Sequence, residues 1–335
     1  TMIGDVVTPT LNTTPESYEL HQAFSQMVEA GCEYAVMEVS SQGIKMHRTD
    51  GLYFDYGIFT NISPDHIGPG EHADFEEYLY YKTRLLNMCR IGLVNKDDEH
   101  AEQIIKAADC ELYTYSEKGK EADFSASDIR YVSQPDFVGT EFHISGKYDM
   151  EVRLGIPGLF NVVNALAAVS VCSFLDRDKE KISHALEHIR VNGRMEIVYT
   201  SERCTVLVDY AHNAVSMESL LSTLRDYKPK RLVCVFGCGG NRSKDRRYSM
   251  GEIGGKLADL SIITADNSRY EKVEDIIADI RGSIEKTGGS FIEIPDRREA
   301  IRYSILQAQP GDMVAVIGKG HEDYQEINGV RHHFL

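Results

Sequence analysis

The stretch TVLVDYAHNAVSMESLLSTLRDYKPKRLVCVFGCGG, residues 205–240, joins two apolar runs through a helical pattern that begins at Ser216. Apolar runs of this length, separated by a helix, are typical of buried parallel strands joined by a crossover. The same rhythm continues with LSIITADN at 260–267, FIEIPD at 291–296 and DMVAVIGKG at 312–320. Further helical patterns begin at Ser249, Val273 and Arg297. The sequence therefore predicts an α/β fold, with a doubly wound sheet in this half of the chain.

The first half of the chain also alternates between helical and strand-like patterns. Helices are expected over residues 16–30, 74–88 and 161–175, and buried strands over residues 34–39 and 56–62. Alternating polar segments between residues 109 and 150 predict a small antiparallel region attached to this domain. A boundary near the sequence VNGR, residues 191–194, divides the chain into domains 1–192 and 193–335.

Composition excludes several classes of function. The chain has 335 residues, a net charge of −16 and a sequence pI near 5.2, which disfavours nucleic acid as a partner. Seven cysteines without a CxxC pair indicate neither a disulfide framework nor a structural zinc site, and they favour a reducing cytoplasm. No apolar run has the length of a membrane span, so a membrane partner is not expected.

A first group of chemically interesting residues follows the two expected strands of the first domain. Glu38 and His66 are predicted to emerge near the carboxyl edge of the sheet, where open α/β sheets bind ligands. A carboxylate and an imidazole in that position suit a magnesium ion or a water-bridged phosphate. Two simpler interpretations stay open: Glu38 bonded to backbone amides at a strand end, and Lys82 as a surface lysine whose stem covers apolar groups.

A second group follows three predicted strands of the second domain. The turn Gly237–Gly240 precedes Arg242 and other cations, DNSR occupies residues 266–269, and GKGHE occupies residues 318–322. Arginine binds a carboxylate in bidentate fashion and glutamate binds an ammonium, so this crevice suits an amino acid. The alternative is an ordinary rim of salt bridges. Neither a GxGxxG fingerprint nor a GxxxxGK[ST] loop occurs, which argues against a nicotinamide dehydrogenase.

Ten sequence blocks, in this order along the chain, resemble the Mur ligase family and, within it, the tripeptide-synthetase branch. The blocks are NTTP (12–15), MEVSSQGIKMHR (37–48), FTNISPDH (59–66), YLYYK (78–82), LFNVVNALAA (159–168), GRMEIV (193–198), DYAH (209–212), FGCGGNRSKDRR (236–247), DNSR (266–269) and GKGHEDYQ (318–325). The resemblance implies a central ATP-binding α/β domain, incomplete at its start, followed by a Rossmann-like domain for the incoming amino acid.

The resemblance also implies roles for individual residues. Contacts to a UDP-linked muramoyl dipeptide would come from Asn12, Thr13, Thr14, Ser40 and Arg48. Magnesium would be bound through Glu38, His66 and Lys82, the last carbamylated so that its ammonium becomes a carboxylate. ATP would contact Asn161, Asn164, Asp209 and His212. The incoming amino acid would contact Arg242, Asp266, Asn267, Ser268, Arg269, Gly318 and Glu322.

The implied reaction is ATP-dependent amide formation in peptidoglycan precursor synthesis, carried out in the cytoplasm by a monomer. The terminal carboxylate of UDP-N-acetylmuramoyl-L-alanyl-D-glutamate attacks the γ-phosphate of ATP, and an amine then displaces phosphate from the acyl phosphate. Arg269 favours meso-diaminopimelate as the added amino acid, since it complements a distal carboxylate and repels the ε-ammonium of lysine. The alternatives are a relative that uses L-lysine or another acidic acceptor, such as a folylpolyglutamate or cyanophycin type of enzyme, and a non-catalytic binding module.

Several positions depart from the family pattern. The phosphate-binding loop GTNGKT and the N-terminal UDP-binding domain, which should precede NTTP, do not occur in these residues, so the chain alone is predicted to be inactive or severely impaired. Ser268 replaces a usual proline, and Met46 replaces a usual polar contact. DHIGPGEH, residues 65–72, replaces DHLDYHG in the loop that carries His66.

Overall fold

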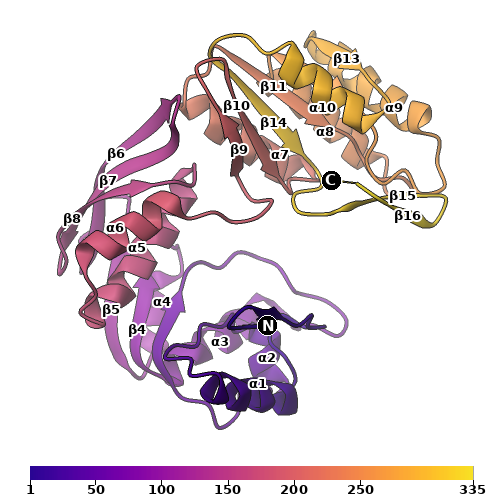
Figure 1. Ribbon diagram of the computed structural model, residues 1–335. Helices are drawn as coiled ribbons and strands as arrows, with labels where there is room; N and C mark the ends of the chain where they lie inside the picture. The colour runs from indigo at the N-terminus through magenta and orange to yellow at the C-terminus, as the bar shows by residue number, and fades with distance from the viewer. Residues whose placement is uncertain (335) are drawn as a thin grey trace. The chain divides into compact units, whose positions relative to one another are not determined.

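The protein is described by a computed structural model that covers residues 1–334 (Figure 1). The chain divides into two compact units. One contains residues 1–127, 144–149 and 166–177, and the other contains residues 128–143, 150–165 and the chain from 178 onward. None of the helices in the described part is long and apolar enough to cross a membrane.

The first half of the chain is an α/β region, as predicted. Its elements are β1 Met2–Ile3, β2 Val6–Val7, α1 Ser17–Glu29, α2 Ser41–Lys45, β3 Phe54–Phe59, α3 Phe75–Thr83, η1 Arg84–Asn87, β4 Cys89–Asn95, α4 Ala101–Ala107, β5 Glu111–Ser116, β6 Phe124–Gln134, β7 Phe137–Gly146, β8 Met150–Leu154, α5 Leu159–Phe174 and α6 Lys179–His188. The three expected helices are confirmed as α1, α3 with η1, and α5. One sheet runs in the order β3-β4-β5-β6-β7-β8, with parallel pairing from β3 to β6.

The expected strand over residues 34–39 is wrong. These residues belong to no helix or strand, and the side chains of Tyr34 and Val36 are 53% and 97% exposed. A strand is stabilised by hydrogen bonds to a neighbouring strand, and the sheet order among the described residues begins at β3, which pairs with β4 alone. The β-branched and aromatic composition is that of a strand, but it does not supply the partner that a strand needs.

The second half forms the doubly wound sheet that its rhythm predicts. Its elements are β9 Glu196–Thr200, β10 Cys204–Asp209, α7 Ala214–Asp226, β11 Arg231–Phe236, α8 Asp245–Leu257, β12 Leu260–Ile263, α9 Val273–Thr287, β13 Phe291–Glu293, α10 Arg297–Leu306, β14 Asp312–Ile317, β15 Tyr324–Ile327 and β16 Val330–His333. The sheet order is β13-β12-β11-β14-β10-β9, in which β9 alone pairs antiparallel. The loops after β12, β11 and β14 therefore leave from adjacent strands at one edge.

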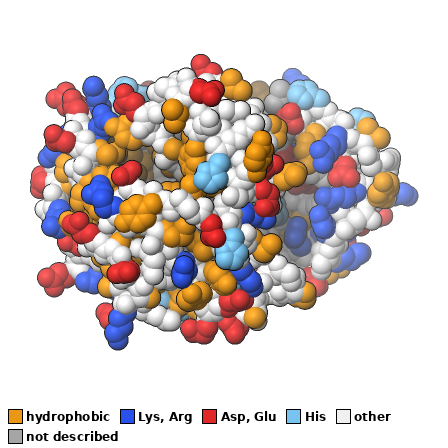
Figure 2. All heavy atoms as spheres, turned by 90° about the horizontal axis from the view of Figure 1, so that it is seen from below, with side chains coloured by type: hydrophobic (Ala, Val, Ile, Leu, Met, Phe, Trp, Pro, Cys, Tyr) orange, Lys and Arg blue, Asp and Glu red, His pale blue; other side chains and the backbone are white. Residues whose placement is uncertain are grey.

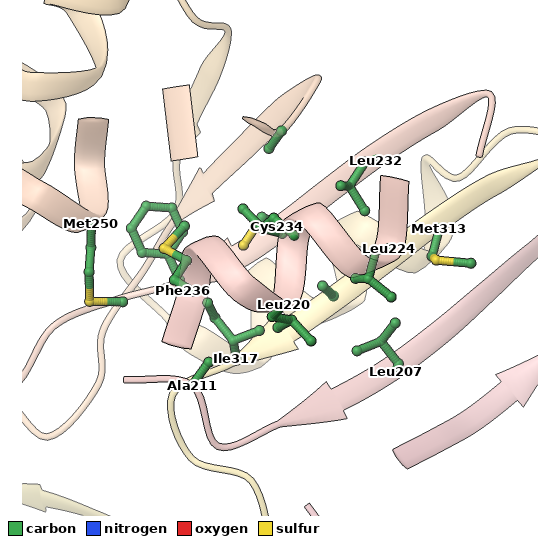
Figure 3. Packing of buried hydrophobic residues seen from close by; sticks show 14 of the residues in the cluster. Leu207, Ala211, Leu220, Leu224, Leu232, Cys234, Phe236, Met250, Met313 and Ile317 are labelled. Atoms are coloured by element: carbon green, nitrogen blue, oxygen red, sulfur yellow. The ribbon is translucent and has the colours of Figure 1, made fainter. Parts of the chain in front are cut away.

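Helices pack on both faces of this sheet because its strands are apolar on both sides. On one face, Leu207 and Cys234 pack with Leu220 and Leu224 of α7 and with Met250 of α8 (Figure 3). Val206, Val233 and Val235 point to the opposite face and pack with Ala300 of α10. The alternation of neighbours such as Val206 and Leu207 follows the two-residue period of a strand. This packed sheet fixes the loops that carry the candidate site.

Candidate functional site

The loops after β11 and β12 lie against each other, which brings the glycine-rich turn to DNSR. The backbone N–H of Gly240 donates to the carbonyl oxygen of Asn267 at 2.8 Å. A Cβ on Gly240 would lie 1.9 Å from the carbonyl oxygen of Ser268, far inside contact distance. Glycine is required here because only a hydrogen fits between the two backbones.

The loop after β14 joins them through a buried lysine. Lys319 Nζ donates to Asn267 Oδ1 at 2.9 Å and to Glu322 Oε2 at 3.2 Å, and it lies 3.5 Å from Asp266 Oδ1. Its side chain is 5% exposed. Asn267 Nδ2 also donates to Glu322 Oε2, at 3.3 Å. The structure thus brings together Asp266, Asn267 and Glu322, three residues expected in the amino-acid site, and adds Lys319, which sequence reasoning missed.

The charges around Glu322 hold it in its ionised form. Burial acts to raise the pKa of this carboxyl group, but the hydrogen bonds from Lys319, Tyr210 and Asn267 outweigh burial, so its pKa lies below the ordinary value of 4.5. Tyr210 donates its phenol to Glu322 Oε1 at 3.1 Å. Burial and this hydrogen bond raise the pKa of Tyr210, which keeps the phenol a donor. A charged carboxylate with a fixed orientation can accept an ammonium group.

The two arginines expected in this site flank Gly239. A Cβ on Gly239 would lie 2.9 Å from Arg269 Nη1 and 3.9 Å from Arg242 Cγ. Arg242 is exposed, whereas Arg269 donates from Nη1 to the carbonyl oxygen of Gly240 at 2.8 Å and pairs through Nε with Glu326 Oε2 at 3.3 Å. Gly318 has a φ of +107°, a conformation that favours glycine. Ser268 is buried beside these groups.

The sequence suggested that the cations after β11 face a ligand, but not all of them do. Arg247 is 1% exposed, and it donates from Nη2 to both carboxylate oxygens of Glu271 at 2.8 Å. Its Nη1 donates to Asp279 at 2.9 Å, and Lys244 also pairs with Asp279. Glu271 in turn accepts the backbone N–H of Asn241. Arg247 therefore fixes the position of Glu271, which in turn holds the glycine-rich loop through the backbone of Asn241.

A cavity of about 390 Å³ lies beside β10, and its size is in the range of small-molecule sites. Three of the four residues expected to contact ATP line it, namely Asn161, Asn164 and Asp209. His212 is exposed and does not line it. Arg194 also lines the cavity, and its guanidinium lies 5.0 Å from the ring centre of Tyr210. Arg194 stands in the GRMEIV block but was not assigned a role from the sequence.

Asp209 has a structural task in this cavity wall. Its Oδ2 accepts the backbone N–H of Met195 at 2.8 Å, and its Oδ1 accepts that of Ala211 at 2.7 Å. The residue is 8% exposed. A carboxylate has about four acceptor positions, so these two bonds fix its orientation and leave capacity for a ligand donor.

The residues expected to contact the muramoyl dipeptide also form a cluster. Ser40 N donates to Thr14 Oγ1 at 2.8 Å, and Thr14 Oγ1 donates to the carbonyl oxygen of Glu38 at 3.1 Å. Arg48 donates from Nη1 to the carbonyl oxygen of Thr14 at 3.2 Å and pairs with Glu16 at 2.8 Å. Asn12 also donates to Glu16, at 3.4 Å, whereas Thr13 is exposed. Four of the five expected residues thus belong to one network.

Two of the expected magnesium ligands, His66 and Lys82, lie against the same ring: the centre of the His66 ring is 5.8 Å from that of Tyr78. Glu38 is exposed, and His66 Nδ1 lies 3.4 Å from Glu71 Oε1. Lys82 Nζ donates to Tyr78 Oη at 3.3 Å and lies 5.4 Å from the centre of that ring, which suits an ammonium group. Within residues 1–334, no group of three or more His, Cys, Asp or Glu side chains is arranged to hold a metal.

Comparison with known proteins identifies the class to which this architecture belongs. Residues 1–172 match the family profile described as the Mur ligase middle domain, and residues 193–320 match that of the Mur ligase, glutamate ligase domain. The two matches thus cover most of both α/β regions. The chain belongs to the Mur ligase family.

Individual relatives agree with this assignment. The chain is 41% identical over 332 residues to a UDP-N-acetylmuramoyl-L-alanyl-D-glutamate--2,6-diaminopimelate ligase of Caldanaerobacter subterraneus subsp. tengcongensis, covering 97% of this chain and 67% of that protein. A Trichormus variabilis ligase of the same name is 40% identical, with coverage of 96% and 65%. A solved structure of that name superposes with a TM-score of 0.75 at 34% identity, covering 96% and 66%. The chain spans about two thirds of the length of these relatives.

Proposed function

We propose that the protein is an ATP-dependent acid–amino-acid ligase of peptidoglycan precursor synthesis. Its substrates are UDP-N-acetylmuramoyl-L-alanyl-D-glutamate and meso-diaminopimelate, as in the names of its relatives. One observation carries the choice of amino acid: Arg269 and Glu322, a cation and an ionised carboxylate, both stand on loops anchored by Asn267 and its backbone. Such a pair complements a ligand that carries a carboxylate and an ammonium.

The work is divided between two domains, 1–192 and 193–335. In the second, Arg242, Asp266, Asn267, Ser268, Arg269, Gly318 and Glu322 form the amino-acid site. In the cavity beside β10, Asn161, Asn164 and Asp209 contact ATP, with Arg194 as an additional cation. His212 is retained as an ATP contact on the resemblance alone. Asn12, Thr13, Thr14, Ser40 and Arg48 orient the muramoyl dipeptide.

The reaction passes through an acyl phosphate. The terminal carboxylate of the dipeptide attacks the γ-phosphorus of ATP, forming a C–O–P linkage and releasing ADP. The amine of the amino acid then attacks the acyl carbon, and phosphate leaves. The chain's own contribution is orientation: the network around Thr14 orients the acceptor, and the network around Asn267 orients the amino acid.

Magnesium belongs to this proposal through the resemblance, with Glu38, His66 and a carbamylated Lys82 as its ligands. When bound, the magnesium ion would neutralise negative charge on the phosphoryl group that is transferred. Carbamylation is tested by incubating the purified protein with ¹³C-bicarbonate and recording its ¹³C NMR spectrum. A carbamate resonance that disappears in Lys82→Arg supports the assignment, and a spectrum without that resonance in the parent protein contradicts it.

The cellular setting is proposed on the same basis. We infer that the protein works in the cytoplasm as a monomer without nucleic acid. Acidic and basic side chains are interspersed on the face seen in Figure 2, and the net charge is −16. Light scattering after gel filtration tests the monomer: a mass near 37.7 kDa supports it, and a multiple of this mass contradicts it.

The deciding experiment is a ligation assay with purified UDP-N-acetylmuramoyl-L-alanyl-D-glutamate, ATP and magnesium. Residues 1–335 are compared with a form that also carries any residues encoded upstream of Thr1. Product mass and phosphate release are followed with meso-diaminopimelate and with L-lysine. Ligation that prefers meso-diaminopimelate supports the proposal, and preference for L-lysine reassigns the amino acid. Failure of both forms with both amino acids overturns the proposal. The same assay checks the expectation that residues 1–335 alone are inactive.

A further inference from the structure

His72 ends the loop that carries His66, and its imidazole is completely buried. The side chain is 0% exposed. The resemblance to Mur ligases assigned His72 no role, and the loop, residues 65–72, departs from the family pattern. The ring of His72 lies against those of Tyr78 and Tyr81, with the ring centres 5.3 Å and 5.8 Å away. A polar ring buried among aromatic side chains depends on its hydrogen bonds.

The imidazole of His72 connects the loop to helix α2. Its Nε2 lies 2.9 Å from Ser41 Oγ, and this contact is buried. Ser41 is the first residue of α2 and follows Ser40, which caps that helix by accepting the backbone N–H of Gly43 at 2.9 Å. Ser40 is one of the residues expected to contact the muramoyl dipeptide. The buried hydrogen bond therefore ties the loop to the residue next to an expected substrate contact.

Two other side chains join α2 to the loop, but their contacts are open to water. Gln42 Nε2 donates to the carbonyl oxygen of Gly70 at 3.2 Å, and Lys45 Nζ donates to that of Glu71 at 2.9 Å, both at exposed positions. Water can replace an exposed hydrogen bond at little cost, whereas a buried group that loses its partner stays unpaired. The buried contact of His72 therefore fixes the loop against α2 more strongly than these two do.

The backbone of His72 holds the part of the loop that carries His66. The N–H of His72 donates to the carbonyl oxygen of His66 at 3.0 Å, and the N–H of Gly68 donates to the carbonyl oxygen of His72 at 3.0 Å. His66 has a φ of +54°, a left-handed conformation that is costly for a residue with a side chain. Such a conformation persists only where its surroundings fix it, and the backbone of His72 is part of those surroundings.

We propose that His72 is a positioning residue that holds the His66 imidazole and the start of α2 in one fixed relation. The inference rests on the proposed function, in which Ser40 contacts the dipeptide and His66 binds magnesium. It deepens that function, because it makes one buried imidazole responsible for placing groups of two expected sites. His72 itself contacts neither ligand, since its side chain is completely buried.

A rival interpretation is a second, hydrolytic site. Ser41, His72 and Glu77 have the residue types of a nucleophile triad, with His72 Nδ1 3.8 Å from Glu77 Oε2. A nucleophile must be reached by its substrate, but Ser41 is 7% exposed and His72 is 0% exposed. The three side chains are therefore a structural network rather than a hydrolytic site.

The test compares three variants of residues 1–335. His72→Leu removes both ring nitrogens, and Ser41→Ala removes the partner hydroxyl while it leaves every aromatic ring in place. His72→Gln is the conservative variant, because its amide reaches about as far as imidazole Nε2 and can pair with the Ser41 hydroxyl in either role. The ring signals of His66 are recorded by ¹H–¹³C NMR and assigned with His66→Gln. Binding of UDP-N-acetylmuramoyl-L-alanyl-D-glutamate is measured by calorimetry.

Loss of the contact is expected to change both readouts. In Ser41→Ala and in His72→Leu, the His66 ring signals should shift, because the ring lies 5.8 Å from that of Tyr78 and senses its ring current. The dissociation constant of the dipeptide should rise about tenfold, as for the loss of one hydrogen bond. His72→Gln should restore the parent values to within about twofold. The double variant of Ser41→Ala and His72→Leu should bind the dipeptide no more weakly than either single variant, because both remove the same contact.

A matched control separates positioning from general destabilisation. His100→Leu removes another histidine of the same compact unit, whose ring centre lies 4.8 Å from that of Phe75. This variant is expected to lower the temperature of thermal unfolding without changing the His66 signals or the affinity for the dipeptide. Thermal unfolding of every variant confirms that the fold is retained.

Unchanged His66 signals and unchanged affinity in Ser41→Ala and His72→Leu would overturn this role. So would losses of affinity that add up in the double variant, a His72→Gln variant that behaves like His72→Leu, or an equal loss of affinity in His100→Leu. A parent protein that binds no dipeptide contradicts the proposed function instead. In that case the His66 signals alone decide: a shift in Ser41→Ala supports the positioning role, and an unchanged spectrum overturns it.

Discussion

The phenol oxygen of Tyr227 accepts the backbone N–H of Gly158 at 3.0 Å, immediately before helix α5 begins at Leu159. The same oxygen lies 2.9 Å from Thr140 Oγ1. Burial raises the pKa of Tyr227 to about 12, so the group is a neutral hydroxyl under all ordinary conditions. One side chain from the end of α7 thus fixes the start of the helix that carries Asn161 and Asn164.

Tyr227→Phe is expected to destabilise the protein by about 1–2 kcal/mol, because it leaves the Gly158 N–H and the Thr140 hydroxyl without their buried partner. Urea unfolding measures this loss. ATP affinity is expected to weaken severalfold through the shifted start of α5. Tyr248→Phe, at a side chain that is 41% exposed, serves as the control and should change neither quantity. Unaltered stability in Tyr227→Phe would contradict the role given to this phenol.

Arg247→Met is expected to cost about 3 kcal/mol of unfolding free energy, since it removes a buried cation from two carboxylates. The loop after β11 loses its support from Glu271 at the same time, so affinity for the amino acid should fall as well. The matched control is Arg281→Met, which breaks the surface pair with Glu293 and should cost less than about 1 kcal/mol. Equal costs for the two variants would mean that Arg247 is an ordinary surface arginine.

Lys319→Met is expected to change the pH dependence of stability. The folded-state pKa of Glu322 lies below its ordinary value of 4.5. The ion pair of Lys319 and Glu322 therefore stabilises the protein above pH 4.5, and this stabilisation is lost as the pH falls through the folded-state pKa. The variant should therefore be less stable than the parent by about 3 kcal/mol at pH 7, and the gap should narrow below about pH 4.5. Urea unfolding between pH 7 and pH 4 measures the difference in unfolding free energy between the parent and the variant. A difference that stays constant with pH would exclude the ionisation of Glu322 as its source.

Gly240→Ala tests the close approach of the loops after β11 and β12. Its methyl group would overlap the carbonyl oxygen of Ser268, which no small side-chain movement relieves, so the two loops must separate. We expect loss of amino-acid binding and a stability cost of about 2 kcal/mol or more. Gly282→Ala is the control, since a Cβ there meets nothing within 4 Å and alanine favours the helix α9. Retained amino-acid affinity in Gly240→Ala would refute the packing of these loops.

Sequence reasoning succeeded where a local pattern carried the information. The apolar runs around Val206, Val233 and Val314 predicted a parallel sheet, because a strand buried on both faces must be apolar throughout. The polar residues that end adjacent strands were likewise expected to meet, and Asp266, Asn267 and Glu322 do.

The failures share a different physical origin. The run over residues 34–39 has strand composition, yet whether a strand forms depends on a partner that composition does not specify. Glu326 and Arg194 approach the site through tertiary packing, and no spacing in the sequence announces them. The structural role of Arg247 was not foreseen either, because a sequence pattern cannot distinguish an arginine that faces solvent from one that is buried and paired with carboxylates.

The side chain of Asn267 limits how this site can be redesigned. Its oxygen accepts from Lys319 and from the backbone of Glu326, and its nitrogen donates to Glu322. Aspartate has nearly the same shape but no donor, and it would place a third carboxylate beside Asp266 and Glu322 around a single ammonium. Leucine is nearly as large but satisfies none of the three partners. An attempt to alter amino-acid preference must therefore leave this one amide untouched and work through its neighbours, because every single replacement of it disturbs three loops at once.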